Sequence, residues 1–319
     1  MSSTTQLICP TTAPAALDDR LGPLPAPSLP RTSWKRLSQA SNPDPNSGGP
    51  TTVLYLAYGS NMAAATFLGM RGIKPISQVN VSVPSLRLTF GLRGVPYWEP
   101  CFANVGFRDA SEKTAPDDWD GRWDGRLMGV VYEVTPSDFG VIMRTEGAGS
   151  SYKDITVPCI PIKSGPEQHD RQPFVARTLY APQDWTDEPR HDGAQPSLRY
   201  LNLLRDGARE HGLPESYQRY LGSLEPYTIT HWRQRVGRFL LLLLWSPMLL
   251  VLIKVMGLMA DETGRVPAGM ATAMSTWFNL MWRSYEIVFK PVFGDGERSE
   301  AEDDGRELES YKLPSSQLV

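Results

Sequence analysis

Short apolar runs that end at turn residues follow one another from residue 53 onward and predict β-strands. The first, Val-Leu-Tyr-Leu-Ala-Tyr at 53–58, ends at Gly59, which is typical of a mostly buried strand that enters a turn. Further runs of this kind lie at 79–83, 86–91, 127–134, 155–162 and 176–182. These are too many strands for an all-helical domain.

Three stretches between and after these strands are expected to be helices. Residues 136–146 follow a threonine that is a candidate N-cap, begin with proline and end before Gly147. An apolar stripe runs along 197–211, and a second short helix is expected over 214–224. Strands followed by helices in this order predict an α+β domain.

Composition divides the chain into four parts. Residues 1–50 hold nine Pro and seven Ser without a sustained apolar period, which predicts a disordered leader. Residues 51–230 carry the predicted strands and helices and form the folded domain. Residues 231–293 are hydrophobic or amphipathic, and 294–319 form an acidic tail that we expect to be solvated and disordered.

The most apolar stretch, 239–260, holds a single charge, Lys254, in 22 residues. As a helix it would reach about 33 Å, which is enough to cross a hydrocarbon core of about 30 Å. Three arginines precede it: Arg233, Arg235 and Arg238. By the positive-inside rule we expect a tail-like membrane anchor with the folded domain facing the cytosol, and a helix within 267–293 lying in the membrane interface. Hairpin or interfacial insertion and packing in a soluble core are the alternatives.

Charge and motif content exclude several classes of function. Lys plus Arg number 32 against 35 Asp plus Glu, a net charge of -3, so no nucleic-acid partner is expected. The three cysteines form no C-x-x-C pair and the four histidines no H-x-x-x-H pair, so we expect no metal site. Phosphate-binding G-x-x-x-x-G-K-[ST] and hydrolase G-x-S-x-G motifs are absent from the sequence, and no cofactor is expected.

Two positions carry candidate chemistry. The turn Tyr58-Gly59-Ser60-Asn61 follows the first strand and precedes a helix expected at 62–69, so its backbone N–H groups could hold a small carboxylate. An ordinary capped turn is the alternative. Glu146 would end its helix, where the helix dipole, and burial if it occurs, would disfavour the charged carboxylate and suit it to proton transfer. A solvated glutamate at a helix end is the alternative.

Four segments in order resemble the γ-glutamylcyclotransferase family and together cover about 53–228. The first is the signature-like turn at 55–62. The others are Gly-Val-Val-Tyr at 129–132, Thr-Glu-Gly at 145–147 with Tyr152 shortly after, and 196–200 running on to 211–217 and 224–226.

The resemblance implies an α+β fold around a mixed, barrel-like sheet with flanking helices. It also implies release of 5-oxoproline from a γ-glutamyl amine or peptide without a cofactor. The backbone of Gly59, Ser60 and Asn61 would bind the substrate α-carboxylate, and Glu146 would move the proton. Tyrosines at the positions of family pocket residues are the remaining candidates: Tyr58 in the turn, Tyr152, which is one residue off the family spacing, Tyr180 and Tyr200.

Fungal pathways to sulfur-containing secondary metabolites use enzymes of this kind on glutathione conjugates, so a γ-glutamyl peptide or such a conjugate is the expected substrate. The 92–126 connection, with its Trp-Asp-Gly-Arg repeat, would admit the bulky conjugate. Two alternatives stay open: a non-catalytic small-molecule-binding protein of the same fold, and a γ-glutamylamine cyclotransferase. The sequence leaves the oligomeric state open.

Overall fold

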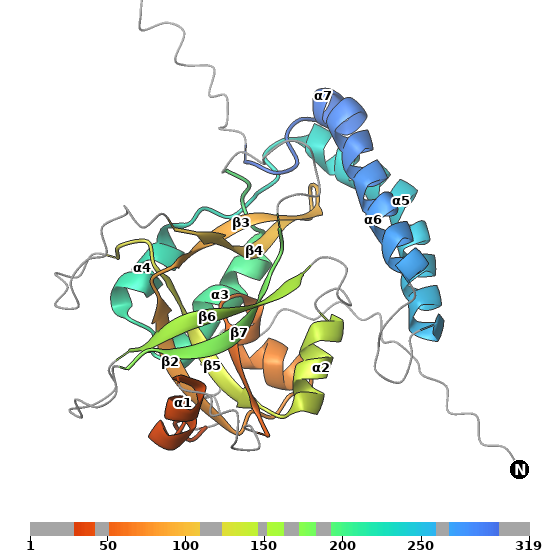
Figure 1. Cartoon of the computed structure of the whole chain (residues 1–319). Helices are drawn as coiled ribbons and strands as arrows, with labels where there is room; N and C mark the ends of the chain where they lie inside the picture. Colours follow the sequence, from red (N-terminus) through yellow and green to blue (C-terminus); the bar gives the residue numbers. More distant parts are fainter. Residues whose placement is uncertain are drawn as a thin grey trace, which may run out of the picture.

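A closed five-stranded barrel forms the body of the protein, with a pair of long helices standing beside it (Figure 1). The computed structural model describes residues 29–41, 51–108, 123–145, 152–162, 172–182, 193–259 and 268–299.

The barrel strands run in the order β1-β5-β2-β6-β7. Their bounds are Val53–Ala57 (β1), Ser77–Val83 (β2), Leu127–Val134 (β5), Lys153–Pro161 (β6) and Phe174–Tyr180 (β7). β1 pairs with β7 in parallel, and the other neighbours are antiparallel. The predicted class, an α+β fold around a mixed barrel, is confirmed, and each barrel strand overlaps an apolar run of the sequence.

β5 shows why one glycine is needed in this barrel. Apart from Glu133, all its residues are buried, so no side of the strand faces water. A Cβ on Gly129 would lie 2.4 Å from the carbonyl oxygen of Ala57, the last residue of β1. Because real Cβ contacts are never this short, only glycine lets β1 and β5 approach where the chain leaves β1.

A separate ribbon, β3 (Leu86–Val95) and β4 (Glu99–Phe107), occupies part of the 92–126 connection. Two buried polar residues interrupt its apolar pattern, Glu99 and Asn104. Asn104 is satisfied by the backbone of Ala181, with bonds of 2.7 and 3.1 Å. Partners so distant in sequence are invisible to pattern analysis, which is why β4 was missed. The first Trp-Asp-Gly-Arg copy lies outside the described residues.

Helices cover the barrel near the predicted positions: α2 (Pro136–Thr145), α3 (Leu198–Glu210) and α4 (Glu215–Ser223). The helix expected at 62–69 is instead a 3-10 turn, η1 (Ser60–Met62), followed by a π-helix, η2 (Ala65–Met70).

Part of the predicted disordered leader is folded. Helix α1 (Trp34–Ser41) buries Leu37 against the barrel, and the Arg36 guanidinium lies 3.3 Å from the carboxylate of Glu133 in β5. The preceding segment pairs with β2, where Thr32 N donates to Gln78 O at 3.0 Å. These partners are far along the chain, so the low apolar content of the leader gave no sign of them. The rest of 1–50, apart from residues 29 and 30, lies outside the described residues.

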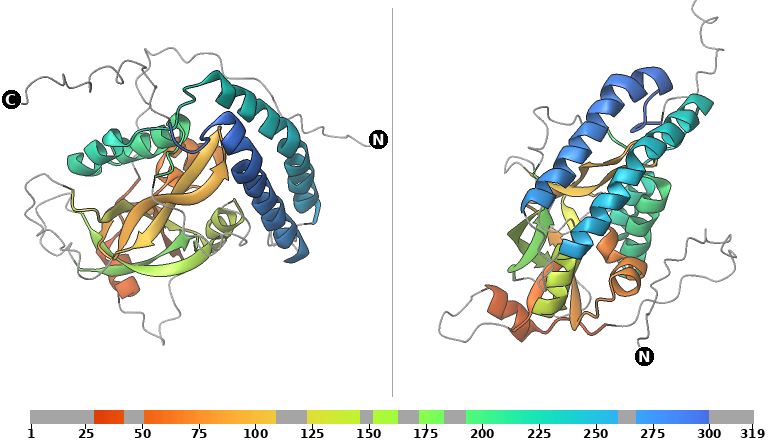
Figure 2. Two further views of the ribbon diagram at one scale, coloured as in Figure 1. Left: turned by 90° about the horizontal axis from the view of Figure 1, so that it is seen from above. Right: turned by 90° about the vertical axis from the view of Figure 1, so that its right-hand side faces the viewer.

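The C-terminal helices form an antiparallel hairpin, in which α5 (Trp232–Met259) lies beside α6 (Ala268–Ser284), η4 (Tyr285–Phe289) and α7 (Lys290–Phe293) (Figure 2). Trp245 Nε1 donates to Ser284 Oγ at 3.0 Å, and the Trp245 and Trp277 rings meet edge to face. A second hydrophobic cluster joins this hairpin to the tip of the β3–β4 ribbon, where Tyr97 is buried.

Residues 294–299, expected to begin a solvated tail, return to the folded domain instead. Tyr97 N donates to Gly296 O at 2.8 Å, and Gln195 N donates to Glu297 O at 2.9 Å. Gln234 Nε2, at the start of α5, donates to Asp295 O at 3.0 Å. The hairpin therefore begins and ends beside the domain, which differs from the tail-like anchor we expected. Residues 300–319 lie outside the described residues.

Candidate active site

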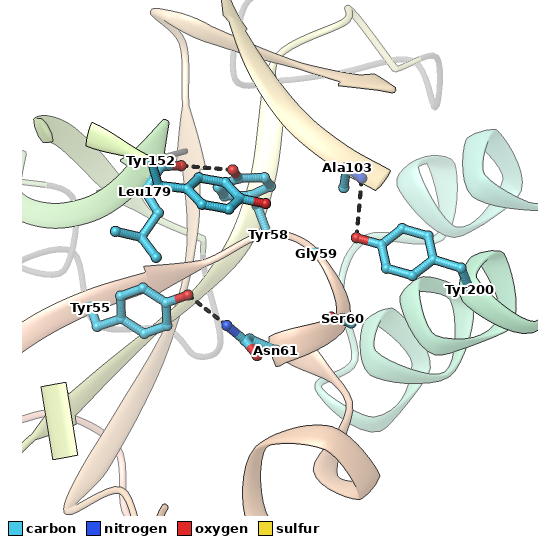
Figure 3. Close-up of a pocket in the computed structure, with 9 residues that line it drawn as sticks. All are labelled: Tyr55, Tyr58, Gly59, Ser60, Asn61, Ala103, Tyr152, Leu179 and Tyr200. Carbon is cyan, nitrogen blue, oxygen red and sulfur yellow. Dashed lines mark hydrogen bonds between the residues drawn. The ribbon is translucent and has the colours of Figure 1, made fainter. Parts of the chain in front are cut away.

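A pocket opens where β1 ends and the chain turns into η1 (Figure 3). Its lining comes from β1, from this turn, from β4 and β7, from the residue before β6 and from α3. The lining residues are Tyr55, Tyr58, Gly59, Ser60, Asn61, Ala103, Tyr152, Leu179 and Tyr200.

Local backbone bonds shape the turn. Met62 N donates to Gly59 O at 3.0 Å and Ala63 N donates to Ser60 O at 3.1 Å, which closes the 3-10 turn. A Cβ on Gly59 would lie 3.2 Å from the Tyr200 hydroxyl and 3.4 Å from Ala103 Cβ. A side chain at this position would therefore crowd the pocket, and glycine keeps the backbone of the turn accessible to a ligand.

Tyrosine hydroxyls are held in place on three sides of the pocket (Figure 3). Tyr58 donates to Leu179 O at 2.7 Å, the Asn61 amide donates to the Tyr55 hydroxyl at 2.8 Å, and Ala103 N donates to the Tyr200 hydroxyl at 3.1 Å. These bonds join the turn, β7, β4 and α3 into one polar, uncharged wall that is organised before a ligand binds.

The position of Tyr200 depends on a buried carboxylate in the ribbon. Ser197 caps α3, accepting from Tyr200 N at 3.1 Å and donating from its hydroxyl to Glu99 at 2.7 Å. Arg199 Nε donates to the other Glu99 oxygen at 2.7 Å. Since Glu99 is only 5% exposed, it fixes the start of α3 against β4. The sequence analysis did not single out Glu99, and its only signal was an acid among apolar residues.

The far end of α3 supports the turn from behind. A Cβ on Gly207 would lie 2.6 Å from Met62 Cβ, so the helix contacts the turn directly. His211 Nε2 lies 3.0 Å from Met62 O and 2.8 Å from the Tyr132 hydroxyl. Burial lowers the pKa of His211, and its bond to the Met62 carbonyl offsets part of this effect. A neutral imidazole that donates from Nε2 to Met62 O fits these contacts.

Six of the predicted site residues meet in this pocket: Tyr58, Gly59, Ser60, Asn61, Tyr152 and Tyr200. Tyr180 is half-buried at the end of β7, outside this lining, where its ring contacts Phe107 at 5.3 Å between centroids. Tyr55 lines the pocket although the sequence analysis did not select it.

Glu146 lies outside the described residues. The chain is described up to Thr145, at the end of α2, and again from Tyr152, which lines the pocket. Within the described ranges, no group of three or more His, Cys, Asp or Glu side chains is placed to hold a metal ion.

Comparison with known proteins places this architecture in a family. The chain is 31% identical over 288 residues to the gamma-glutamyl cyclotransferase gliK of Aspergillus fumigatus, covering 88% of this chain and 98% of that protein. It is 32% identical over 252 residues to the gamma-glutamyl cyclotransferase aclK of Aspergillus oryzae, covering 77% and 90% respectively. The chain belongs to the γ-glutamyl cyclotransferase family.

Two family models match separate parts of this cyclotransferase. The AIG2-like family matches residues 126–221, and the AclK C-terminal domain matches residues 231–292, the hairpin. Among solved structures, a human protein titled uncharacterized protein loc79017 is 23% identical with a TM-score of 0.41, covering 57% of this chain and 93% of that one. A structure titled gamma-glutamyl cyclotransferase is 22% identical with a TM-score of 0.40, covering 56% and 92%.

Proposed function

We propose that this cyclotransferase releases 5-oxoproline from a γ-glutamyl peptide or glutathione conjugate bound in the tyrosine-lined pocket. The observation that carries the proposal is the accessible turn at Gly59, which lies between the hydrogen-bonded hydroxyls of Tyr58 and Tyr200. Its backbone suits a substrate α-carboxylate, while the tyrosines and the Asn61 amide offer neutral hydrogen-bond partners to the rest of the glutamyl group. Residues 51–230 would form the catalytic domain.

The reaction needs one acid/base group and a fixed substrate geometry. The α-amine attacks the γ-carbonyl carbon, a new C–N bond closes the five-membered ring, and the bond to the departing nitrogen breaks. Glu146 takes a proton from the α-ammonium group and returns one to the departing nitrogen, so no water is consumed. Because the pocket holds the γ-glutamyl group of the substrate folded on itself, its own α-amine acts as the nucleophile and no external nucleophile is needed. Tyr152, six positions after Glu146 in the sequence, lines the pocket, which supports Glu146 as the acid/base group.

A turnover assay on the full chain tests the proposal. Native protein should release 5-oxoproline, and Glu146→Gln should lose about 100-fold or more in rate, the usual scale for a positioned proton-transfer group. Glu215→Gln, an exposed glutamate at the start of α4, is the matched control and should keep the native rate. No product from the native protein would favour the non-catalytic binding alternative, and an active Glu146→Gln variant would remove Glu146 from the mechanism.

The proposal also specifies the leaving group of the reaction. We infer that a glutathione conjugate is preferred, as in a fungal secondary-metabolite pathway, because relatives of this chain come from Aspergillus species and the described part of the 92–126 connection contributes Ala103 to the pocket lining. Comparing glutathione, a γ-glutamyl dipeptide, an S-conjugate and a γ-glutamylamine by kcat/KM ranks the substrate classes. Preference for the dipeptide would contradict the conjugate, and preference for the amine would favour the γ-glutamylamine alternative.

We also propose that the segment 239–260 attaches the enzyme to a membrane, with the catalytic domain facing the cytosol. Among the described helices, α5 is long and apolar enough to cross a bilayer. The arginines at its start support the cytosolic orientation.

A further inference from the structure

The outer surface of α5 is apolar and exposed along most of its length. Only 11% of its most apolar window is buried inside the protein, and Leu243 and Leu250 are 60% and 66% exposed. Further exposed apolar side chains continue this surface: Phe239, Leu244, Met248, Val251 and Ile253. Soluble monomers rarely expose so large an apolar face, so a partner covers it.

The rest of the hairpin covers only one stripe of α5. Leu241 is fully buried, and a Cβ on Gly237 would lie 2.7 Å from Phe293 Cβ, so α5 and α7 are already in close contact. No helix of the described chain lies over the opposite side of α5 (Figure 2).

The returning helices have a polar stripe that α5 lacks. Exposed polar residues recur at intervals of four and three along α6, η4 and α7: Thr272, Thr276, Asn279, Arg283, Glu286 and Lys290. This spacing places them on one helical face. Glu286 pairs with Arg93 of the ribbon at 3.3 Å and Lys290 pairs with Asp295 at 3.0 Å, so the stripe ends beside the folded domain. Immersing it in hydrocarbon would cost too much for a second spanning helix.

Both ends of the hairpin are tied to the domain. Besides the Gln234 to Asp295 bond, Thr228 N donates to Ser299 Oγ at 2.8 Å, which joins the segment before α5 to the segment after α7. A single crossing by α5 would place these two segments on opposite sides of the membrane, and the bonds between them would break.

From this geometry we propose that the α5–α6 hairpin inserts into one leaflet of an anionic bilayer without crossing it. The apolar face of α5 enters the acyl chains, while the polar stripe and the C-terminus stay on the side of the barrel. The exposed arginines Arg233, Arg235 and Arg238 lie where α5 leaves the domain and attract anionic headgroups. A second copy of the chain fits less well, because this face lacks the polar rim of a protein interface.

The inference rests on the proposed membrane attachment, and a flotation assay tests that attachment separately. The full chain is mixed with sealed phosphatidylcholine vesicles containing about 30% phosphatidylserine. We expect it to float with the vesicles, and Leu243→Glu with Leu250→Glu to weaken binding at least about tenfold. Met70→Glu with Ile76→Glu, which charges two exposed apolar side chains outside the hairpin, is the matched control and should bind normally. Failure of the native chain to bind, or a change from dimer to monomer in the leucine variant, would overturn the attachment.

Site-specific labelling then tests the topology on vesicle-bound protein. In a Cys9→Ser background, whose remaining Cys101 and Cys159 are buried, one cysteine at a time is introduced at Asn279, Leu250 or Ser316 and treated with a membrane-impermeant maleimide. We expect Asn279→Cys and Ser316→Cys to react as fast as in solution, and Leu250→Cys to be protected. Protection of both Asn279→Cys and Ser316→Cys would mean a single crossing by α5, and protection of Asn279→Cys alone would mean a two-helix crossing. Either result overturns the one-leaflet hairpin while leaving attachment and catalysis intact.

Discussion

The barrel and the hairpin are both rich in apolar residues, yet only the barrel buries its apolar side chains on all sides. The barrel cluster joins all five strands to α1 and to the helices that cover them, and its central leucines are inaccessible. The hairpin cluster has seven buried residues, five of them aromatic, while leucines on the other side of α5 are more than half exposed. Apolar residues form a closed core only where elements surround them on every side, and two helices with a ribbon tip leave one side open.

The β3–β4 ribbon connects these two regions. At its tip, Gly94 O accepts from Trp282 Nε1 at 3.1 Å and Tyr97 packs in the hairpin cluster. Further along, Glu99 and Ala103 hold α3 and Tyr200 at the pocket. One element thus supports both the candidate active site and the C-terminal hairpin.

A matched pair of leucine truncations should show the largest difference in stability between the barrel and the exposed face of α5. Leu204→Ala, fully buried in the barrel cluster, should lower the free energy of unfolding by about 2 to 5 kcal/mol, because it removes apolar contacts and leaves a cavity. Leu243→Ala, 60% exposed, should change it by less than about 0.5 kcal/mol. Urea unfolding of the lipid-free protein measures both. Equal losses would mean that water does not reach the α5 face.

A pair of glycine substitutions tests whether turnover depends on packing beside the pocket or on packing within the hairpin. Gly207→Ala forces a Cβ against Met62 and should cost about 1 to 3 kcal/mol, together with about tenfold or more in turnover, since the turn must shift. Gly237→Ala meets Phe293 as tightly but should leave turnover unchanged. Gly222→Ala, in α4 with open space around its Cβ, is the control and should be neutral or slightly stabilising. Loss of turnover in Gly237→Ala would show that the hairpin controls the pocket.

The smallest expected effect is a pH dependence of the stability of the barrel domain, caused by His211. Because burial lowers the pKa of His211 below its ordinary 6.5, the unfolded chain binds this proton more readily than the folded protein does. The stabilisation is present above pH 6.5 and is lost as the pH falls toward the lowered pKa. Thermal unfolding between about pH 7.5 and 5.5 should therefore show a shallower loss for His211→Gln than for the native chain. Identical slopes would mean that the pKa of His211 is not lowered in the folded protein.

Local patterns predicted much of the barrel and its covering helices. Apolar runs located the barrel strands, and the stripe over 197–211 located α3 with Ser197 as its observed cap. The motif resemblance selected six residues that line one pocket. Each of these signals is a local pattern within one segment of the chain, so it can be recognised without knowledge of the fold. The proton-transfer role of Glu146 stays a prediction.

Distant partners explain what the sequence analysis missed. α1 is held by the Arg36 contact with Glu133, and β4 places Glu99 under the cap of α3. Tyr55 belongs to the pocket because Asn61 folds back onto it across the turn. None of these pairings changes the pattern of apolar and polar residues in its own segment, so pattern analysis could not detect them.

The sequence by itself determined the five barrel strands, the helices α2, α3 and α4, the glycine turn and the apolar character of α5, because these depend on neighbouring residues and on local backbone preferences. Only the tertiary structure decided that the leader helix packs on the barrel and that the chain after α7 returns to the domain. The reason is physical: the hydrogen bonds that hold these segments join residues tens to hundreds of positions apart, and their partners come within reach only once the barrel has closed.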